Sequence, residues 1–147
     1  MNFRTFFVLG AAVLSLLATG AQAQQTEIGK TEFRLRCAAC HGPTGQGDGM
    51  IGQMLKVPPP DLTRIAERNG GAFPFKKVYD IVDGRQAIAA HGTRDMPIWG
   101  DSYRAEQLPL KPLPKDATEA QVDAPERAVE AHILAIVYYI GTLQAGK

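Results

Sequence analysis

The sequence predicts a small all-α domain of three to five helices joined by long loops. Apolar residues recur at helical spacing in several segments, and no run alternates between apolar and polar residues as a half-buried strand would. Glycine and proline are dense between the periodic segments. Loops of this length in a compact domain usually enclose a ligand or a functional site.

The first residues differ from the rest of the chain. A short positive stretch containing Arg4 is followed by nearly continuous apolar sequence over 6–18, and then by the small residues Ala21 and Ala23. This three-part pattern is typical of a secretory signal. We expect residues 1–23 to be a signal peptide cleaved after Ala23, and residues 24–147 to form one periplasmic domain. An uncleaved anchor is the alternative, but the apolar stretch is shorter than the roughly 20 residues that cross a bilayer.

The composition narrows the range of partners. The 147 residues carry a formal net charge of +1 at pH 7 without a long basic run, so nucleic acid is not an expected partner. Beyond the first segment no stretch is apolar and long enough to predict a membrane span. Cleavage of the signal would therefore leave no transmembrane anchor.

The first helix of the domain is expected from Thr26 to Ala39, because its apolar residues fall on one side. Thr26 is the expected N-cap, and Gly42-Pro43 should stop the helix. The following stretch, Pro43 to Asp61, is a predicted loop. Its many glycines allow the backbone to approach a large group closely.

Two shorter helices are expected in the middle of the chain. The first covers Leu62 to Arg68, with Asp61 or Thr63 as its cap. The second covers Phe75 to Val82 and ends at Gly84.

The C-terminal part should hold the clearest helix, from Ala124 to Leu143, which has a broad apolar face. Pro125 would then occupy a first-turn position, where proline is tolerated. Before this helix, Gln86 to Tyr103 is predicted to be irregular and Leu108 to Pro114 to be an extended surface segment.

The segment from Cys37 to His41 reads Cys-Ala-Ala-Cys-His, which is the C-x-x-C-H pattern of covalent haem attachment. The spacing suits this chemistry, because two thiols must add to the two vinyl groups on one edge of the porphyrin. The adjacent histidine then projects its imidazole toward the iron. The motif predicts one haem c, bound by Cys37 and Cys40, with His41 as an axial ligand.

Two other interpretations of the cysteine pair are weaker. A redox-active dithiol should open a helix after a strand, whereas this pair closes a predicted helix. A zinc site needs further ligands, and the chain has no second C-x-x-C and no paired histidines at finger spacing.

Met96 is the predicted second axial ligand. It lies in the turn-forming segment Asp95 to Gly100, far enough from His41 to reach the opposite face of the haem. Ligation by methionine and histidine raises the reduction potential and suits electron transfer. The ordinary alternative for Met96 is core packing. His91 could take its place and give bis-histidine iron, or could be an exposed or loop-bonding histidine.

Ordinary structural roles are expected for two further methionines and one histidine. Met50 and Met54 are expected to be packing or surface residues. His132 lies within the predicted C-terminal helix and is expected to be structural.

At these motifs the chain resembles a class I cytochrome c, most closely the bacterial periplasmic cytochromes with one haem. The family's pieces occur in order at Cys37–Gly42, Pro58–Leu62, Asp83–Arg85 and Met96–Gly100. With the first and last helices, the likeness covers nearly all of the mature chain.

The resemblance implies a cytochrome c-like fold in which the first and last helices cross near Gly29. Phe33 and Tyr139 would form an aromatic pair at that crossing. One departure from the smallest family members is the long, proline-rich connection from Gly100 to Ala124, which could be an inert loop or a docking surface.

The resemblance also implies supporting roles around the haem. A carbonyl within Pro58–Pro60 would accept the N–H of His41 and fix its tautomer. Arg85 and Trp99 would contact a haem propionate, although Arg85 could equally be a solvated charge.

The predicted function is that of a periplasmic electron carrier, not an enzyme, because two filled axial positions leave no place for a substrate. Its partners would be redox proteins such as a dehydrogenase, an oxidase or a reductase. The chain could instead be the cytochrome subunit of a dehydrogenase or oxidase complex. It could also be a five-coordinate haem enzyme or gas-binding protein, if Met96 does not bind iron.

Overall fold

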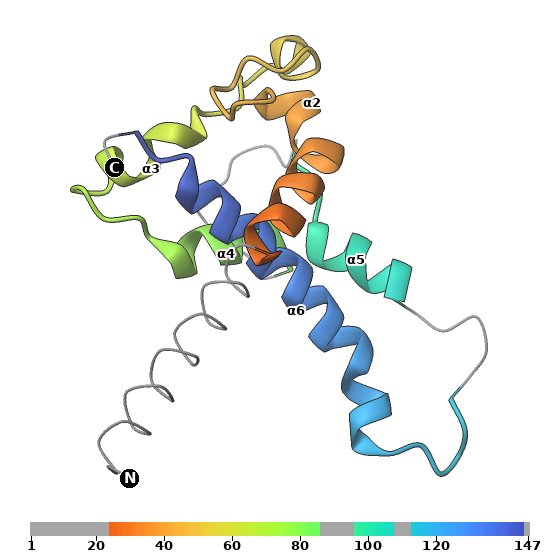
Figure 1. The fold of residues 1–147 in the computed structure, drawn as a ribbon. Helices are drawn as coiled ribbons and strands as arrows, with labels where there is room; N and C mark the ends of the chain where they lie inside the picture. Colours follow the sequence, from red (N-terminus) through yellow and green to blue (C-terminus); the bar gives the residue numbers. More distant parts are fainter. Residues whose placement is uncertain (1–23, 86–95, 108–112, 146–147) are drawn as a thin grey trace, which may run out of the picture.

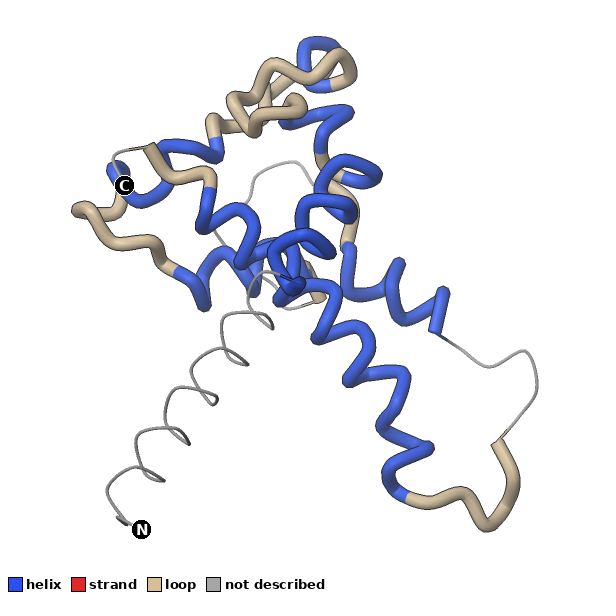
Figure 2. Tube along the Cα trace, in the orientation of Figure 1, coloured by secondary structure: helices blue, strands red, loops and turns tan. Residues whose placement is uncertain are grey.

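The structure is a computed structural model of the 147-residue chain, and it describes residues 24–85, 96–107 and 113–145. All regular elements in these ranges are helices (Figures 1 and 2), which confirms the all-α prediction. The expected signal peptide lies outside the described residues. So do His91 and residues 108–112, which formed most of the expected extended segment.

The N-terminal helix ends at the predicted cysteine motif. Residues 24–36 are helical, Cys37 forms a turn, and the short helix α2 (Ala38–His41) follows. Gly42 then ends α2 with a positive φ of 79°, which glycine adopts without strain. The N-cap prediction for Thr26 is wrong, because this residue lies inside the helix.

The middle of the chain follows the prediction closely. The predicted loop contains one 3-10 turn, η1 (Gly52–Met54). Two short helices come next, η2 (Leu62–Arg64) and α3 (Ile65–Arg68). The Asp61 carboxylate caps η2 by accepting from the Thr63 N–H at 2.8 Å.

Helix α4 (Phe75–Asp83) matches its predicted range, and Gly84 ends it in the left-handed conformation. Helix α5 (Trp99–Gln107) was not predicted, so the expectation of irregular structure is wrong for the last residues of 86–103. Its buried residues are Gly100 and Tyr103. Two buried positions are too few to produce a helical periodicity in the sequence. Packing of α5 against neighbouring elements therefore stabilises this helix.

Helix α6 (Glu119–Thr142) begins five residues before the predicted start, so that boundary is wrong. A capping box sets the start, because Thr118 and Gln121 exchange side-chain to backbone hydrogen bonds. Pro125 therefore lies inside the helix and not in its first turn. Its nitrogen carries no hydrogen for the helix ladder, and the nearby Arg127 guanidinium donates to the Ala120 carbonyl.

Helix α6 is the central support of the domain. Figure 1 shows the N-terminal helix crossing it, and α4 and α5 both pack against it. A Cβ atom added to Gly29 would lie 1.9 Å from the Ala135 carbonyl oxygen. Phe33 and Tyr139 meet beside this point with ring centroids 5.3 Å apart. The predicted crossing and its aromatic pair are thus present.

The core forms around this crossing. Half of its residues come from α6, and the other half from the N-terminal helix, the turn that follows it, α4 and α5: Phe33, Cys37, Val78, Val82, Tyr103, Val129, Ile133, Ile136, Val137 and Ile140. The buried Gln144 joins the end of α6 to the η2–α3 region, because it accepts from the Ala66 N–H and donates to the Leu62 carbonyl. Cys37 of the cysteine motif is therefore part of the core itself.

We expect the substitution Gly29→Ala to lower the free energy of unfolding by about 2 kcal/mol or more, because the added methyl group would push the two helices apart. Gly141→Ala is the matched control in α6, since its new Cβ would meet the Phe73 ring at 3.5 Å, an ordinary contact distance. This control should stabilise the protein by roughly 0.5–1 kcal/mol through helix propensity. Urea unfolding of the purified proteins measures both, and equal effects would contradict the close crossing.

Candidate functional site

The cysteine motif forms a single tight turn at the end of the N-terminal helix. The N–H groups of Cys40 and His41 both donate to the Cys37 carbonyl, at 3.1 and 2.9 Å. The thiols of Cys37 and Cys40 are free, and Cys37 is buried while Cys40 is partly exposed. The turn thus presents two unpaired thiols and an imidazole from one short stretch of backbone.

His41 has the environment of a ligand and not of a surface residue. Its side chain is buried, and Nδ1 has no partner at hydrogen-bond geometry. Burial lowers the pKa of His41, while the Pro60 backbone carbonyl acts in the opposite direction. The ring is therefore neutral at pH 7, which is the form that binds metals. The carbonyl that faces it is that of Pro60, within the predicted Pro58–Pro60 segment.

Glycines fold the loop tightly onto this turn. A Cβ atom at Gly49 or Gly52 would lie 2.5 or 2.3 Å from the Cys40 carbonyl oxygen, so only glycine permits the approach. The Ile51 N–H donates to the Ala39 carbonyl at 2.9 Å. The glycine-rich loop therefore packs directly against the backbone of the cysteine motif.

The chemistry of the thiols argues against a redox-active dithiol. Burial raises the pKa of Cys37 to about 12, and the nearby Glu32 carboxylate adds to this effect. Reactive dithiol cysteines have the opposite property, a lowered thiol pKa. Nor do the described residues contain a group of three or more His, Cys, Asp or Glu side chains that could hold a metal ion. The arrangement of Cys37, Cys40 and His41 fits covalent haem attachment better than either alternative.

The structure brings Met96 to the same core as the cysteine motif. Its side chain is partly buried and packs against the cluster that contains Cys37. The chain after it is fixed at Ile98, because a Cβ atom at Gly84 would lie 3.3 Å from the Ile98 Cα. Met96 is thus a partly buried thioether packed on the core cluster that contains Cys37, and its ligation of iron stays a prediction.

Arg85 and Trp99 have different surroundings. Arg85 is paired with two carboxylates, Asp83 at 2.8 Å and Glu126 at 2.6 Å. These bonds already occupy much of its guanidinium, which weakens the expectation of a propionate contact. Trp99 is partly buried at the start of α5 and packs against the core, and its contact with a haem propionate stays a prediction.

A polar cluster that the sequence did not predict lies directly before Cys37. Arg36 is its centre. The guanidinium donates to Glu32 at 3.0 Å and makes two bonds to Glu106, at 2.9 and 2.7 Å. It also lies over the rings of Tyr103 and Trp99, 4.5 and 5.8 Å from their centroids. We call these residues, together with His132, the Arg36 cluster.

The rest of the Arg36 cluster is closely packed and charged. The buried Tyr103 hydroxyl donates to Glu32 at 2.6 Å, and the Tyr103 ring stacks on His132 with centroids 4.8 Å apart. His132 Nδ1 lies 3.3 Å from the Glu32 carboxylate. Burial would raise the pKa of Glu32, but the hydrogen bonds from Tyr103 and Arg36 lower it overall. His132 is therefore placed in a structural contact, as predicted.

The sequence contained only part of the signal for this cluster. Glu32 and Arg36 are four residues apart, the spacing of a helical ion pair. Their partners Tyr103 and Glu106 lie on α5, which had no helical pattern, so the long-range contacts were not predictable.

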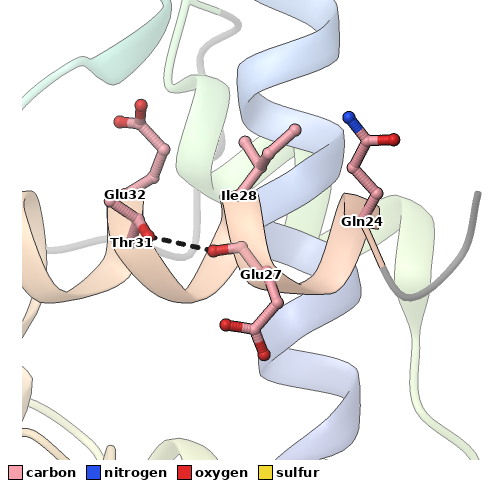
Figure 3. A pocket seen from close by; sticks show the side chains of 5 residues that line it. All are labelled: Gln24, Glu27, Ile28, Thr31 and Glu32. Atoms are coloured by element: carbon pink, nitrogen blue, oxygen red, sulfur yellow. Dashed lines mark hydrogen bonds between the residues drawn. The ribbon is translucent and has the colours of Figure 1, made fainter.

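Two open surface hollows lie along the N-terminal helix. Figure 3 shows one whose side chains all come from the N-terminal helix, where the Thr31 hydroxyl donates to the Glu27 carbonyl at 3.0 Å. A second hollow is lined by Thr31, Arg34 and Leu35 of the same helix. Because one helix supplies the whole lining, neither hollow encloses a ligand or includes the cysteine motif. No helix among the described residues combines the length and the apolar character that a membrane crossing needs.

Comparison with known proteins agrees with the geometry. The chain is 31% identical over 103 residues to CcoP, a Cbb3-type cytochrome c oxidase subunit of Azospirillum brasilense. That match covers 69% of this chain but 30% of the relative, so the chain corresponds to less than a third of that protein. No solved structure matches the chain significantly.

The family model for cytochrome c matches residues 26–144, from the N-terminal helix to the end of α6. That range holds the cysteine motif, the helix crossing and Met96. Covalently bound c-type haem is the cofactor that this family implies, and the free thiols and the neutral, buried imidazole fit it. The chain belongs to the cytochrome c family.

Proposed function

We propose that the protein is a periplasmic electron carrier with one covalently bound haem c, whose iron is held by His41 and Met96. One observation carries the proposal. The attachment turn and Met96 are packed against the same core cluster, although they lie far apart in the sequence. This juxtaposition is what a haem bound between a histidine and a methionine requires.

The bound haem would supply reversible one-electron chemistry. The chain supplies its placement. Cys37 and Cys40 would hold the porphyrin edge through thioether bonds, and the neutral His41 would bind the iron while the Pro60 carbonyl lies near its ring. Met96 would favour the reduced state and raise the reduction potential.

Two filled axial positions favour electron transfer over catalysis, since neither leaves room for a substrate on the iron. The expected signal peptide supports a periplasmic location. The chain has 16 basic and 15 acidic side chains, so its charges nearly balance. Redox partners would therefore recognise local surface features and would not be steered by net charge.

Electrons would leave the haem at the edge next to Cys40. This cysteine is partly exposed, whereas Cys37 is buried. The loop beside it presents an apolar surface, which we call the loop patch: Met50, Ile51, Met54 and Val57 are all exposed, and both methionines are 82% exposed. Exposed apolar groups of this kind mark contact surfaces, and methionine adapts readily to different partners.

A second function is favoured by the comparison with CcoP, which is a subunit of an oxidase. The chain could act as the cytochrome subunit of such a complex with the same haem chemistry. The first turns of α6 add support, because its buried residues begin only at Val129 and leave the preceding turns open to a fixed partner. Co-purification from the native source in a fixed ratio with another redox protein would favour this function, and a lone monomer would oppose it.

The substitution Met96→Ala tests the axial ligand. The ferric wild-type protein should show the weak sulfur-to-iron charge-transfer band, and the variant should lose it. The reduction potential should also fall by more than about 60 mV, a tenfold change for a one-electron couple. Visible spectroscopy and potentiometric titration measure the two effects.

Met54→Ala is the matched control, because this methionine is 82% exposed and should leave both properties unchanged. A band that persists in Met96→Ala would show that the sulfur ligand lies elsewhere in the chain, whereas low-spin wild-type iron without the band would point to a nitrogen ligand, with His91 as the first candidate. High-spin wild-type iron that binds carbon monoxide readily would contradict the carrier function and favour the five-coordinate alternative.

The double substitution Met50→Lys and Met54→Lys tests the exit route. A second copy of the protein serves as the probe, since electron self-exchange needs no identified partner. Two new like charges at the loop patch should slow self-exchange roughly tenfold at low salt, with little change in the potential. NMR line broadening in mixtures of oxidised and reduced protein gives the rate.

Val122→Lys is the control for that experiment, because this residue is 56% exposed on the early turns of α6. It should leave the rate close to that of the wild type. A patch variant as fast as the wild type would show that electrons leave by another face.

A further inference from the structure

Arg36 joins two parts of the chain that the proposed haem site needs at a fixed distance. It directly precedes the attachment residue Cys37 in the N-terminal helix. Its guanidinium reaches across to α5, where it makes a two-bond ion pair with Glu106 and covers the rings of Trp99 and Tyr103. The contact thus ties the attachment helix to both ends of α5.

Helix α5 in turn carries the segment with the proposed axial ligand. Met96 lies three residues before Trp99, the first residue of α5. The Ile98 carbonyl accepts from the backbone N–H of Ser102 at 3.1 Å, so this short link continues the helical turn. A displacement of α5 from the attachment helix would therefore move Met96 with it.

The opposite side of this segment is held by α4. Gly84 packs against Ile98, and a Cβ atom at Gly100 would lie 2.1 Å from the Asp83 carboxylate and 2.4 Å from Arg85 Nε. The Arg85 guanidinium continues this contact to Glu126 of α6 at 2.6 Å. The segment 96–100 therefore contacts the end of α4 and also contributes Trp99 to the Arg36 cluster.

We infer that Arg36 is a positioning residue for Met96, acting through Trp99, Tyr103 and Glu106 to keep the thioether of the ligand segment close to the haem iron. The inference rests on the proposed function, because it assumes that Met96 binds iron. It assigns no contact between Arg36 and the haem.

The residue type matters for this role. A guanidinium is planar, so it can make two parallel bonds to the Glu106 carboxylate and lie flat over aromatic rings. A lysine ammonium keeps the positive charge but loses both features. Arg36→Lys therefore separates the positioning effect from the effect of the charge beside Cys37.

The test measures how easily Met96 leaves the iron. Imidazole is the probe, because it binds ferric haem only in the population from which the methionine has moved away. The apparent Kd of imidazole varies inversely with that open population. Loss of the two-bond pair and the flat ring contact should raise the open population about tenfold. Spectroscopic titration of Arg36→Lys holoprotein should therefore give an imidazole Kd about tenfold lower than that of the wild type.

Arg64→Lys is the matched control. Arg64 also makes two bonds to a carboxylate, that of Glu67, at 2.7 and 2.6 Å, but this exposed pair lies on the η2–α3 segment. Its substitution should leave the imidazole Kd unchanged. Glu106→Ala is a second test if Arg36→Lys does not fold, since it removes the α5 partner and keeps the Glu32–Arg36 pair; its Kd should fall in the same direction.

The outcomes separate the inference from the function on which it rests. If the ferric wild type shows the sulfur-to-iron band but Arg36→Lys and Glu106→Ala keep the wild-type imidazole Kd, the positioning role is wrong and the proposed function stands. If the wild type lacks the band, the ligand assignment fails and the positioning role fails with it. Equal effects of Arg36→Lys and Arg64→Lys would also overturn the inference, because they would reflect general stability.

Discussion

The close crossing of the N-terminal helix and α6 at Gly29 is the contact on which the rest of the structure depends. It allows the Phe33 and Tyr139 rings to meet and places the following turn of the helix, with Cys37, in the core. Because α4 and α5 pack on the same long helix, the crossing also sets where they lie relative to the cysteine motif. A wider separation would move the attachment turn away from every other part of the site.

The cysteine motif lies at the end of the N-terminal helix. The packing of this helix therefore also positions the residues that are proposed to bind haem. The end of the helix gives a rigid backbone for Cys37, Cys40 and His41, and the glycine loop closes over it without side chains in the way. Burial keeps the imidazole neutral, while the partly exposed Cys40 leaves one edge near the surface. With haem iron held here as proposed, little would have to move when the charge of the iron changes, which would favour exchange of electrons over binding of a substrate.

The parts of the fold that could be predicted from the sequence are those with local causes. The end of the first helix, the cap at Asp61 and the end of α4 at Gly84 follow from single residues whose backbone or hydrogen-bond preferences decide the outcome. The parts that could not be predicted depend on distant residues. Helix α5 buries little more than Tyr103, and the first turns of α6 contain no buried residue, so neither α5 nor the start of α6 produced an apolar pattern. The Arg36 cluster could not be predicted for the same reason, because its residues come from three different helices. In the site, the C-x-x-C-H spacing predicted the residues that would attach the haem, whereas the pairing of Arg85 with Asp83 and Glu126 needed the structure.

The central claim is that the iron is held by His41 on one side and Met96 on the other. X-ray absorption at the iron edge of the purified ferric protein tests it most directly, because sulfur and nitrogen ligands scatter differently. We expect six-coordinate iron with one sulfur ligand, and loss of that sulfur in the Met96→Ala protein. Iron surrounded only by nitrogen, or iron with an empty sixth position in the wild type, would contradict it.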